Sequence, residues 1–290
     1  MAITSNNLLL PVSVCEACRL PRSRIPCKDY TNDQCVFKCC GREGIKGCNS
    51  KKSIRNSSKL FKSSKKTLME IVRIIFEYFV KGLNACEAQR EICQYYPIDY
   101  KTIFKLYKYT RKIISEYITQ QARETKLGPT NVIEIDESVF ARTNNHKSGY
   151  DIHKKNAKIW VLGFFERNTK QARAFIVPDR SKKTLLKFIS DNVAEGSTIY
   201  TDSWKGYNGL CENYAHKAIN KSERRPSKYG ECGTNQIESL WSLIKRDICK
   251  YSCFKKNNIQ EFINESLWRR QFKSIDERIQ SLISLFQIKH

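Results

Sequence analysis

The feature that most constrains the fold is a short alternating segment, Val132 to Asp136, near the middle of the 290-residue chain. Its two isoleucines alternate with two acidic residues, which is the two-residue period of a β-strand with one apolar face. Gly128-Pro129, a pair typical of turns, precedes it. A strand with an apolar face needs other elements to cover it, so the segment predicts a sheet with a carboxylate at the end of one strand.

The segments that follow alternate between strand and helix patterns. The predicted elements are strands at 160–165 and 174–177, a helix from Ser181 to about Asn192, a strand at 198–201 and a helix that opens near Thr234. Three strands, a helix, a strand and a later helix form an order compatible with a mixed α/β layer fold of the RNase H-like kind. We therefore predict an α/β catalytic domain of this kind.

Three carboxylates fall at the ends of these elements: Asp136, Asp202 and Glu238. Cleaving and joining a phosphodiester needs an activated attacking oxygen and a stabilised leaving oxygen, which two Mg²⁺ (or Mn²⁺) ions about 3.5 to 4 Å apart can supply. Hard oxygen ligands suit those ions. The hypothesis is that Asp136 bridges the two ions, with Asp202 and Glu238 holding one each.

Each of these carboxylates also has a structural interpretation. Asp136 could end an edge strand, and Asp202 could cap a turn or helix that begins at Ser203. Asn235 and Glu238 have the spacing of a capping box at the start of an ordinary amphipathic helix. The spacing alone leaves these alternatives open.

The charge balance indicates a polyanionic partner. The chain carries 52 Lys and Arg against 29 Asp and Glu, a net charge of +23, which favours nucleic acid. A basic surface kept for solubility is the alternative. The sequence contains no apolar run of about 18 residues and no signal-peptide pattern. We therefore expect an intracellular protein without a membrane partner, located in the nucleus if the host is eukaryotic and otherwise in the cytoplasm or nucleoid.

Seven of the 13 cysteines lie between Cys15 and Cys48, which favours a structural Zn²⁺ over disulfides. A four-thiolate shell would hold together a segment too small for its own core. The preferred ligands are Cys15, Cys18, Cys39 and Cys48, and Cys40 or Cys35 could replace Cys39. A loop with free thiols is the alternative.

Helical patterns fill the region between the cysteines and the sheet. They predict a helix over 67–81, a second that begins after Asn84, and a third from Asp99 to about Arg123. The third helix carries lysines at a spacing that puts them on one face: Lys101, Lys105, Lys108 and Lys112. Three helices with a basic third resemble a helix-turn-helix that reads a major groove, although a helical spacer with a solvated lysine face fits equally well.

Several motifs in order carry a resemblance to a known family. They are Ile133-Glu-Ile-Asp-Glu-Ser138, Trp160-Val-Leu-Gly163, Ile199-Tyr-Thr-Asp-Ser-Trp-Lys-Gly-Tyr207, Thr234-Asn-Gln-Ile-Glu-Ser-Leu-Trp241 and Glu265-x-x-Trp268-Arg269-Arg270. From about Asn131 to Arg270 the chain resembles the catalytic domain of the ISXO2-like (Merlin-type) DDE transposases. The upstream cysteine cluster looks like that group's zinc-ribbon segment.

The resemblance implies a DNA transposase with Asp136, Asp202 and Glu238 at the acidic triad positions. His216 matches a region where the family usually carries a histidine that could orient DNA or water, and Asn235 is a supporting residue beside Glu238. Lys205 and Lys245 would offset phosphate charge near the triad. A dimer or higher homo-oligomer is expected, because two transposon ends must be processed together.

The expected organisation has four parts: a zinc-ribbon-like segment at 1–50, a basic linker at 51–66, a helical DNA-binding region at 67–127, and a catalytic domain with C-terminal helices at 128–290. Two other functions remain open. One is a transposase-derived, catalytically inactive DNA-binding protein. The other is a cellular RNase H-like nuclease without strand transfer, which the zinc and helical front half disfavours.

Overall fold

The computed structural model describes residues 65–129, 131–142, 158–219, 233–249 and 258–287, together with most of 15–53 (15, 17–20, 22–27, 33, 35–42 and 45–53). Most of the predicted linker at 51–66 lies outside the described residues. The chain divides into two compact units, one made of Met1–Ile113 with Phe272–His290 and the other of Ile114–Gln271. Each unit is described by itself, and the four-part division drawn from the sequence stays a prediction.

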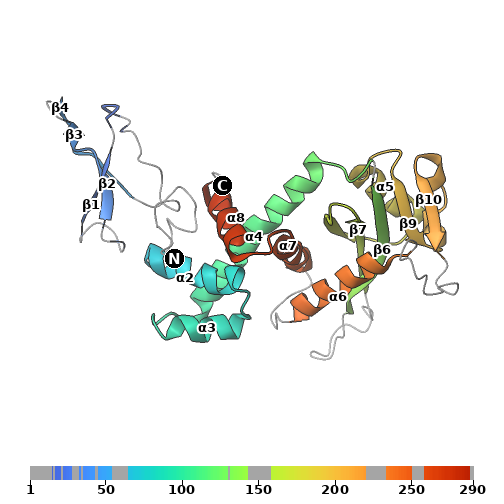
Figure 1. Ribbon diagram of the computed structural model, residues 1–290. Helices are drawn as coiled ribbons and strands as arrows, with labels where there is room; N and C mark the ends of the chain where they lie inside the picture. The colour runs from blue at the N-terminus through green and yellow to red at the C-terminus, as the bar shows by residue number, and fades with distance from the viewer. Residues whose placement is uncertain are drawn as a thin grey trace, which may run out of the picture. The chain divides into compact units, whose positions relative to one another are not determined.

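The second unit is built on a five-stranded mixed sheet with the order β10-β9-β6-β7-β8 (Figure 1). The strands are β6 (Val132–Arg142), β7 (Lys158–Glu166), β8 (Ala172–Val177), β9 (Thr198–Asp202) and β10 (Ala215–Ile219). β6, β7 and β8 pair antiparallel, whereas β9 runs parallel to β6 and β10 parallel to β9. This order, with the first strand central, is that of an RNase H-like fold, so the predicted fold class is confirmed.

Helices cover the two faces of this sheet. Because side chains alternate along a strand, Ile133 and Ile135 of β6 face one core, which includes Leu185 and Ile189 of α5 (Lys182–Asn192). The opposite face packs against α6 (Asn235–Cys249) and α7 (Ile259–Gln271). Two short 3₁₀ helices, η3 (Lys205–Tyr207) and η4 (Leu210–Glu212), connect β9 to β10.

The central strand is longer than its sequence pattern indicated. The sequence predicted that Asp136 ends the strand, but β6 continues to Arg142 because β7 pairs with it along its whole length. What ends near Asp136 is the pairing with β9, whose last paired position opposite β6 is Tyr200. Asp136 therefore lies inside a central strand, and the interpretation as an edge-strand terminus is wrong.

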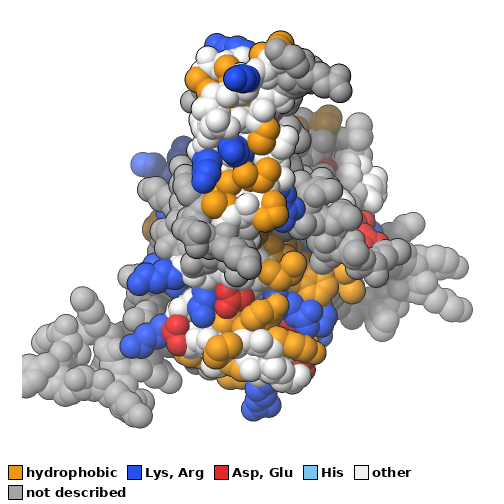
Figure 2. Space-filling view, turned by 90° about the vertical axis from the view of Figure 1, so that its left-hand side faces the viewer, with side chains coloured by type: hydrophobic (Ala, Val, Ile, Leu, Met, Phe, Trp, Pro, Cys, Tyr) orange, Lys and Arg blue, Asp and Glu red, His pale blue; other side chains and the backbone are white. Residues whose placement is uncertain are grey.

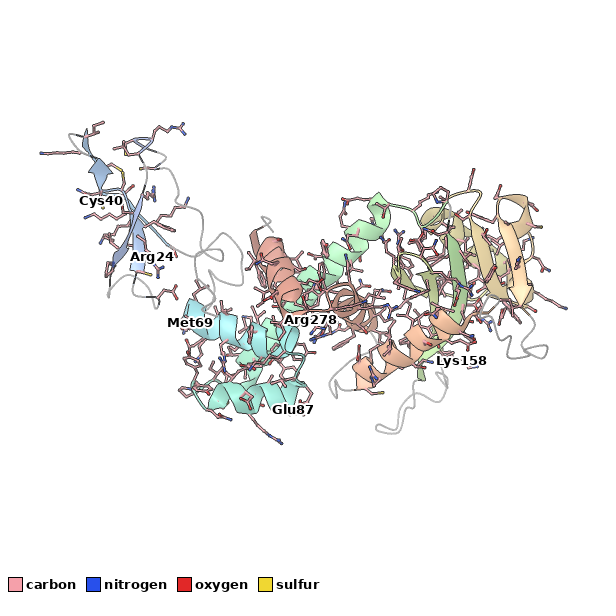
Figure 3. All side chains as sticks on the ribbon, in the orientation of Figure 1. Arg24, Cys40, Met69, Glu87, Lys158 and Arg278 are labelled. Atoms are coloured by element: carbon pink, nitrogen blue, oxygen red, sulfur yellow. The ribbon has the colours of Figure 1, made fainter. Side chains whose placement is uncertain are left out.

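The helices of the first unit begin where the sequence predicted. They are α2 (Leu68–Ile75), which continues as the π-helix η2 (Phe76–Val80), then α3 (Ala85–Cys93) and α4 (Tyr100–Glu124), whose last turns belong to the second unit. Thr67 and Asn84 each form a capping box, the second with Glu87 (Figure 3). Asp99 accepts a hydrogen bond from the Thr102 amide at 2.9 Å.

The last helix, α8 (Ile275–Gln287), belongs to the unit of α2 and α3. The guanidinium of Arg278 (Figure 3) donates to the Val80 carbonyl oxygen at 2.9 Å. Val80 is the last residue of η2, so this contact joins the C-terminal helix to the N-terminal ones.

The cysteine-rich segment forms two small sheets. β1 (Ser23–Pro26), β2 (Cys35–Lys38) and β5 (Lys51–Ser53) pair antiparallel, and β3 (Gly41–Arg42) forms a hairpin with β4 (Ile45–Lys46). Among the helices in the described part of the chain, none combines the length and the apolar composition that a membrane crossing needs.

Candidate active site and cysteine cluster

The register between the two parallel central strands brings two of the predicted carboxylates to the same end of the paired segment. β6 pairs with β9 as Val132 with Thr198 and Glu134 with Tyr200, an offset of 66 residues. Asp136 and Asp202 differ by the same 66 residues, and each lies two residues beyond the last paired position. Both carboxylates therefore lie where the two parallel strands separate. Asp136 is 7% exposed and Asp202 is half-buried.

The helix that carries Glu238 is anchored to Asp136 by a tryptophan. The indole Nε1–H of Trp241 donates to Asp136 Oδ2 at 3.1 Å within the buried face of the sheet. The close approach depends on Gly163, which pairs with Asp136 across the strands. A Cβ at Gly163 would lie 2.3 Å from Trp241 Cη2. Glu238 precedes Trp241 by three residues, so both project from the same face of α6.

A second acidic residue of β6 fixes the start of that helix. Glu134 is fully buried, and its Oε2 accepts the backbone N–H groups of Gln236 at 2.9 Å and Ile237 at 3.0 Å. These are among the amides that a helix leaves unpaired at its N-terminus. Glu134 Oε1 pairs with Arg167 Nε at 2.7 Å, and Arg167 also donates to the Gly233 carbonyl oxygen at 2.7 Å. The network holds the first turn of α6, and therefore Glu238, against the central strand.

This network differs from the capping box considered for Asn235 and Glu238. Asn235 is the first helical residue rather than the cap, and its exposed side chain lies beside Gly233. Glu238 instead accepts a hydrogen bond from the Thr234 hydroxyl at 3.3 Å and is half-buried. The capping acceptor comes from a distant strand, which sequence spacing could not reveal.

Asp202 shapes the turn that follows β9. Its Oδ1 accepts the backbone N–H of Trp204 at 3.0 Å, so the turn interpretation of Asp202 is correct and is compatible with a ligand role for the same carboxylate. The preceding residue, Thr201, donates its hydroxyl to the Asp202 carbonyl oxygen at 2.7 Å. His216 Nε2 lies 2.8 Å from the Thr201 oxygen, and burial lowers the His216 pKa. His216 therefore supports the end of β9 through Thr201.

On the other face of β6, a buried acid next to Asp136 was not singled out by the sequence analysis. The Glu137 side chain is fully buried, and Arg180 Nη2 donates to its Oε2 at 3.2 Å. Burial raises the pKa of the Glu137 carboxyl, and the positive charge of Arg180 opposes that rise. Burial also raises the pKa of Tyr207 well above its usual range, with further contributions from the charges of Glu137, Asp136 and Asp202. These carboxylates thus share one electrostatic environment around the Tyr207 hydroxyl.

The predicted DNA-contacting lysines are all on the surface. Blue Lys and Arg side chains outnumber red Asp and Glu on the described surface shown in Figure 2. Lys245 lies on α6, with its Nζ 5.5 Å from the Phe140 ring centroid, and Lys205 begins η3 directly after the Asp202 turn. The exposed lysines are Lys101, Lys105, Lys108, Lys112, Lys205 and Lys245.

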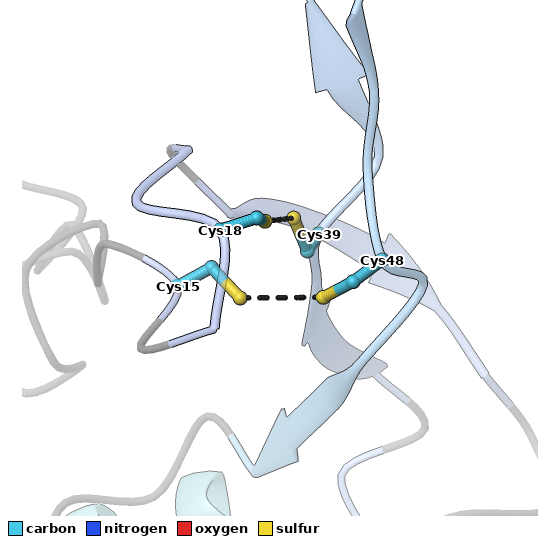
Figure 4. Close-up of side chains that lie close together, drawn as sticks. All are labelled: Cys15, Cys18, Cys39 and Cys48. Carbon is cyan, nitrogen blue, oxygen red and sulfur yellow. Dashed lines mark hydrogen bonds between the residues drawn. The ribbon is translucent and has the colours of Figure 1, made fainter.

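Four of the cysteines converge. Within the described residues, the one group of three or more candidate ligands whose atoms all lie within 4.8 Å is Cys15, Cys18, Cys39 and Cys48 (Figure 4). Asp136, Asp202 and Glu238, which the structure describes, are not in such a group. Cys15 Sγ is 3.4 Å from Cys48 Sγ, and Cys18 Sγ is 3.2 Å from Cys39 Sγ. A tetrahedral zinc with Zn–S bonds of about 2.3 Å has S···S edges of about 3.8 Å, so the four thiols fit such an ion.

The backbone explains why Cys39 rather than Cys40 joins the group. Cys39 and Cys48 flank the β3–β4 hairpin, where Gly41 has a φ of +86° and a Cβ at Gly47 would lie 2.5 Å from the Cys39 carbonyl oxygen. Cys40 is exposed, on the other side of the chain. The Ser50 hydroxyl and then the Cys18 backbone lower the pKa of Cys15 to about 5, whereas the Cys18 side chain and then burial raise the pKa of Cys39 to about 11.

We expect the chain purified without added metal to carry about one zinc, because the group is a closed four-sulfur shell. Cys39→Ser should lose that zinc, and Cys40→Ser, the matched change one residue away, should keep it. Elemental analysis of both variants measures the difference. Equal zinc in the two variants would show that Cys39 is not a ligand.

The sheet order, with the first strand central, defines a class of protein: the RNase H-like domains. Within that class, residues 128–271 match the family model of the ISXO2-like transposase domain. This segment of the chain is therefore an ISXO2-like transposase domain, as its motifs predicted.

The chain also has similarity to one transposase-like relative and to solved structures. An uncharacterized transposase-like protein of Haemophilus influenzae is 28% identical over 111 residues, which are 38% of this chain and 89% of that protein. The catalytic core domain of BIV integrase aligns with 50% of this chain and 86% of its own, at 11% identity and a TM-score of 0.33. The HTLV-2 integrase catalytic core domain in complex with magnesium aligns with 52% and 90%, at 14% identity and a TM-score of 0.32.

Proposed function

We propose that the chain is a DNA transposase that nicks DNA at transposon ends and transfers the freed strand into target DNA. Its substrate is double-stranded DNA, and its reactive site consists of Asp136, Asp202 and Glu238 with Mg²⁺ or Mn²⁺. The observation that carries the proposal is that Asp136 and Asp202 each lie two residues beyond the last paired position of β6 and β9, at the end where the two strands separate. The transposase domain supports the reaction class.

The donor set suits a hard divalent cation. All three side chains offer carboxylate oxygens, which such ions prefer. The two other acids of the same strand segment are each paired with an arginine, Glu134 with Arg167 at 2.7 Å and Glu137 with Arg180 at 3.2 Å. These pairings assign Glu134 and Glu137 to other roles. When bound, the ions would activate the attacking oxygen and stabilise the leaving oxygen.

The chain's own residues orient the ligands and attract the substrate. The Trp241 indole N–H fixes one oxygen of Asp136, and the Trp204 amide N–H fixes one oxygen of Asp202. Fixed carboxylates need little reorganisation when the reaction starts, which lowers its barrier. The exposed ammonium groups of Lys205 and Lys245 attract the phosphate backbone.

The rest of the chain serves DNA recognition in this proposal. The exposed lysines of α4 track phosphates, and the cysteine segment holds a structural Zn²⁺ that shapes a second DNA contact. A dimer or higher oligomer allows two transposon ends to be processed together. These modules do not depend on the acidic site, so a catalytically inactive DNA-binding protein is the second candidate function.

The test uses the full chain and a labelled duplex that carries the terminal repeat flanking its gene. We expect 3′-end nicks and joined products with Mg²⁺ or Mn²⁺, and none in a chelator that spares the zinc segment. Nicks without joined products would indicate a nuclease. Tight binding without any product under either ion would overturn the catalytic proposal and leave the DNA-binding function.

A further inference from the structure

An exposed tryptophan stands directly beside the acidic site. Trp204 is 43% exposed, whereas the other large apolar side chain exposed in the described part of its unit is the aliphatic Ile176. Its position is tied to the site because its amide N–H donates to Asp202 Oδ1 at 3.0 Å. A turn after Asp202 needs only that amide, so the turn does not explain an indole. The side chain at this position therefore calls for a separate explanation.

The indole is held in place although it is exposed. Its Nε1–H donates to the Arg180 carbonyl oxygen at 3.4 Å. The ring also lies against the backbone of Gly206, where a Cβ would be 2.6 Å from Trp204 Nε1. Fixing an aromatic side chain that stays 43% exposed costs side-chain entropy without the full gain of burial. A ring fixed in advance is instead suited to receive a flat partner.

One face of the ring is covered by a guanidinium. Arg180 Cζ lies 4.5 Å from the centroid of Trp204 and 4.5 Å from that of Trp160, so the guanidinium sits against both indoles. Glu137, fully buried, pairs with Arg180 from a third direction. These contacts place a positive charge behind the exposed ring. An aromatic ring with a cation against one face can stack its other face on the electron-rich face of a nucleobase.

We propose that Trp204 is a stacking platform for one unpaired nucleobase of the DNA strand that enters the acidic site. This inference rests on the proposed function, because it requires a DNA strand at Asp202. Stacking on an aromatic ring is sequence-tolerant, and it requires a base that is free of its partner strand. The platform therefore recognises a locally opened strand next to the bond to be cut, and Arg180 is the residue that positions it.

The test compares single-stranded and duplex DNA without chemistry. The probes are a fluorescein-labelled oligothymidylate of about 20 nucleotides, longer than the site of a single binding module, and a duplex of the same length. Ca²⁺ replaces Mg²⁺, and anisotropy gives the affinities of the full chain. Trp204→Leu keeps an apolar side chain without a π-face, Trp204→Phe keeps a ring, and Ile176→Ala controls for loss of exposed apolar surface.

Trp204→Leu should weaken oligothymidylate binding about tenfold, with less than about a twofold change for the duplex. Trp204→Phe should recover most of the affinity, and Ile176→Ala should match the native chain. Equal losses for both probes, or no loss, would overturn the platform. The outcome is separable from catalysis. If the native chain cleaves DNA but Trp204→Leu shows no selective loss of oligothymidylate binding, only the platform is refuted. If Trp204→Leu shows that loss but the native chain cleaves no DNA, only the transposase function is refuted.

Discussion

Asp202→Asn should abolish DNA nicking and strand transfer, with a loss of at least about a thousandfold. The amide oxygen of asparagine can still accept the Trp204 N–H that Asp202 Oδ1 accepts at 3.0 Å, so the turn after β9 survives. What disappears is the negative charge that a divalent cation needs. Asp202→Ala removes both the charge and the turn acceptor and should be at least as inactive. Cleavage and joining of the labelled terminal-repeat duplex measure the loss.

The matched control for this prediction is Asp191→Asn on α5. Asp191 is an exposed aspartate whose nearest cation, Lys187 Nζ, lies 3.6 Å away in an i,i+4 pair. Such surface pairs contribute little, so the control should cleave and join like the native chain. Asp202→Asn with native activity would remove Asp202 from the site. Loss in both variants would point to a general effect of charge.

Glu134→Ala should lower the free energy of unfolding of the sheet unit by about 3 kcal/mol or more, because it leaves buried hydrogen-bond and ion-pair partners without their acceptor. The Arg167 guanidinium and the amides of Gln236 and Ile237 would all lose the acceptor that they share. All four tryptophans, residues 160, 204, 241 and 268, belong to this unit. Tryptophan emission during urea unfolding therefore reports on the sheet unit without interference from the other one.

Glu134→Gln separates structure from chemistry. The glutamine oxygen can still accept the α6 amides, so we expect a smaller stability loss of about 1 to 2 kcal/mol. Its cleavage activity should stay within about tenfold of native, in contrast to Asp202→Asn. A catalytic collapse in folded Glu134→Gln would mean that Glu134 belongs to the reactive site. An unchanged unfolding curve for Glu134→Ala would refute the anchoring network.

Local sequence patterns predicted most of the elements of this fold. Alternation identified β6, short apolar segments identified β7 to β9, and capping residues such as Ser181 and Asn84 located helix starts, because those signals depend on neighbours along the chain. The order of the elements was then enough to predict the sheet class. The triad positions were predicted from motifs and stay a prediction, and the strand register brings Asp136 and Asp202 to the same end of the paired segment.

Partners distant in sequence could not be predicted in this way. Glu134 caps a helix that begins about a hundred residues later, and Glu137 pairs with Arg180 across the fold. An amphipathic stripe shows that α8 buries one face, but it does not say which unit covers that face. The choice of Cys39 over Cys40 depends on the geometry of a hairpin with glycines at 41 and 47.

Gly163, the last residue of the Trp160-Val-Leu-Gly163 motif, matters for surveys of genomic copies of the gene. Any side chain at this position would displace Trp241, whose Cη2 is 2.3 Å from where a Cβ would stand, and so disturb the hydrogen bond to Asp136. Under the proposed function, a genomic copy that keeps all three acidic codons but not Gly163 would encode an inactive protein. Counting intact triads would then overestimate the number of mobile copies, and the codon for residue 163 should be scored with them.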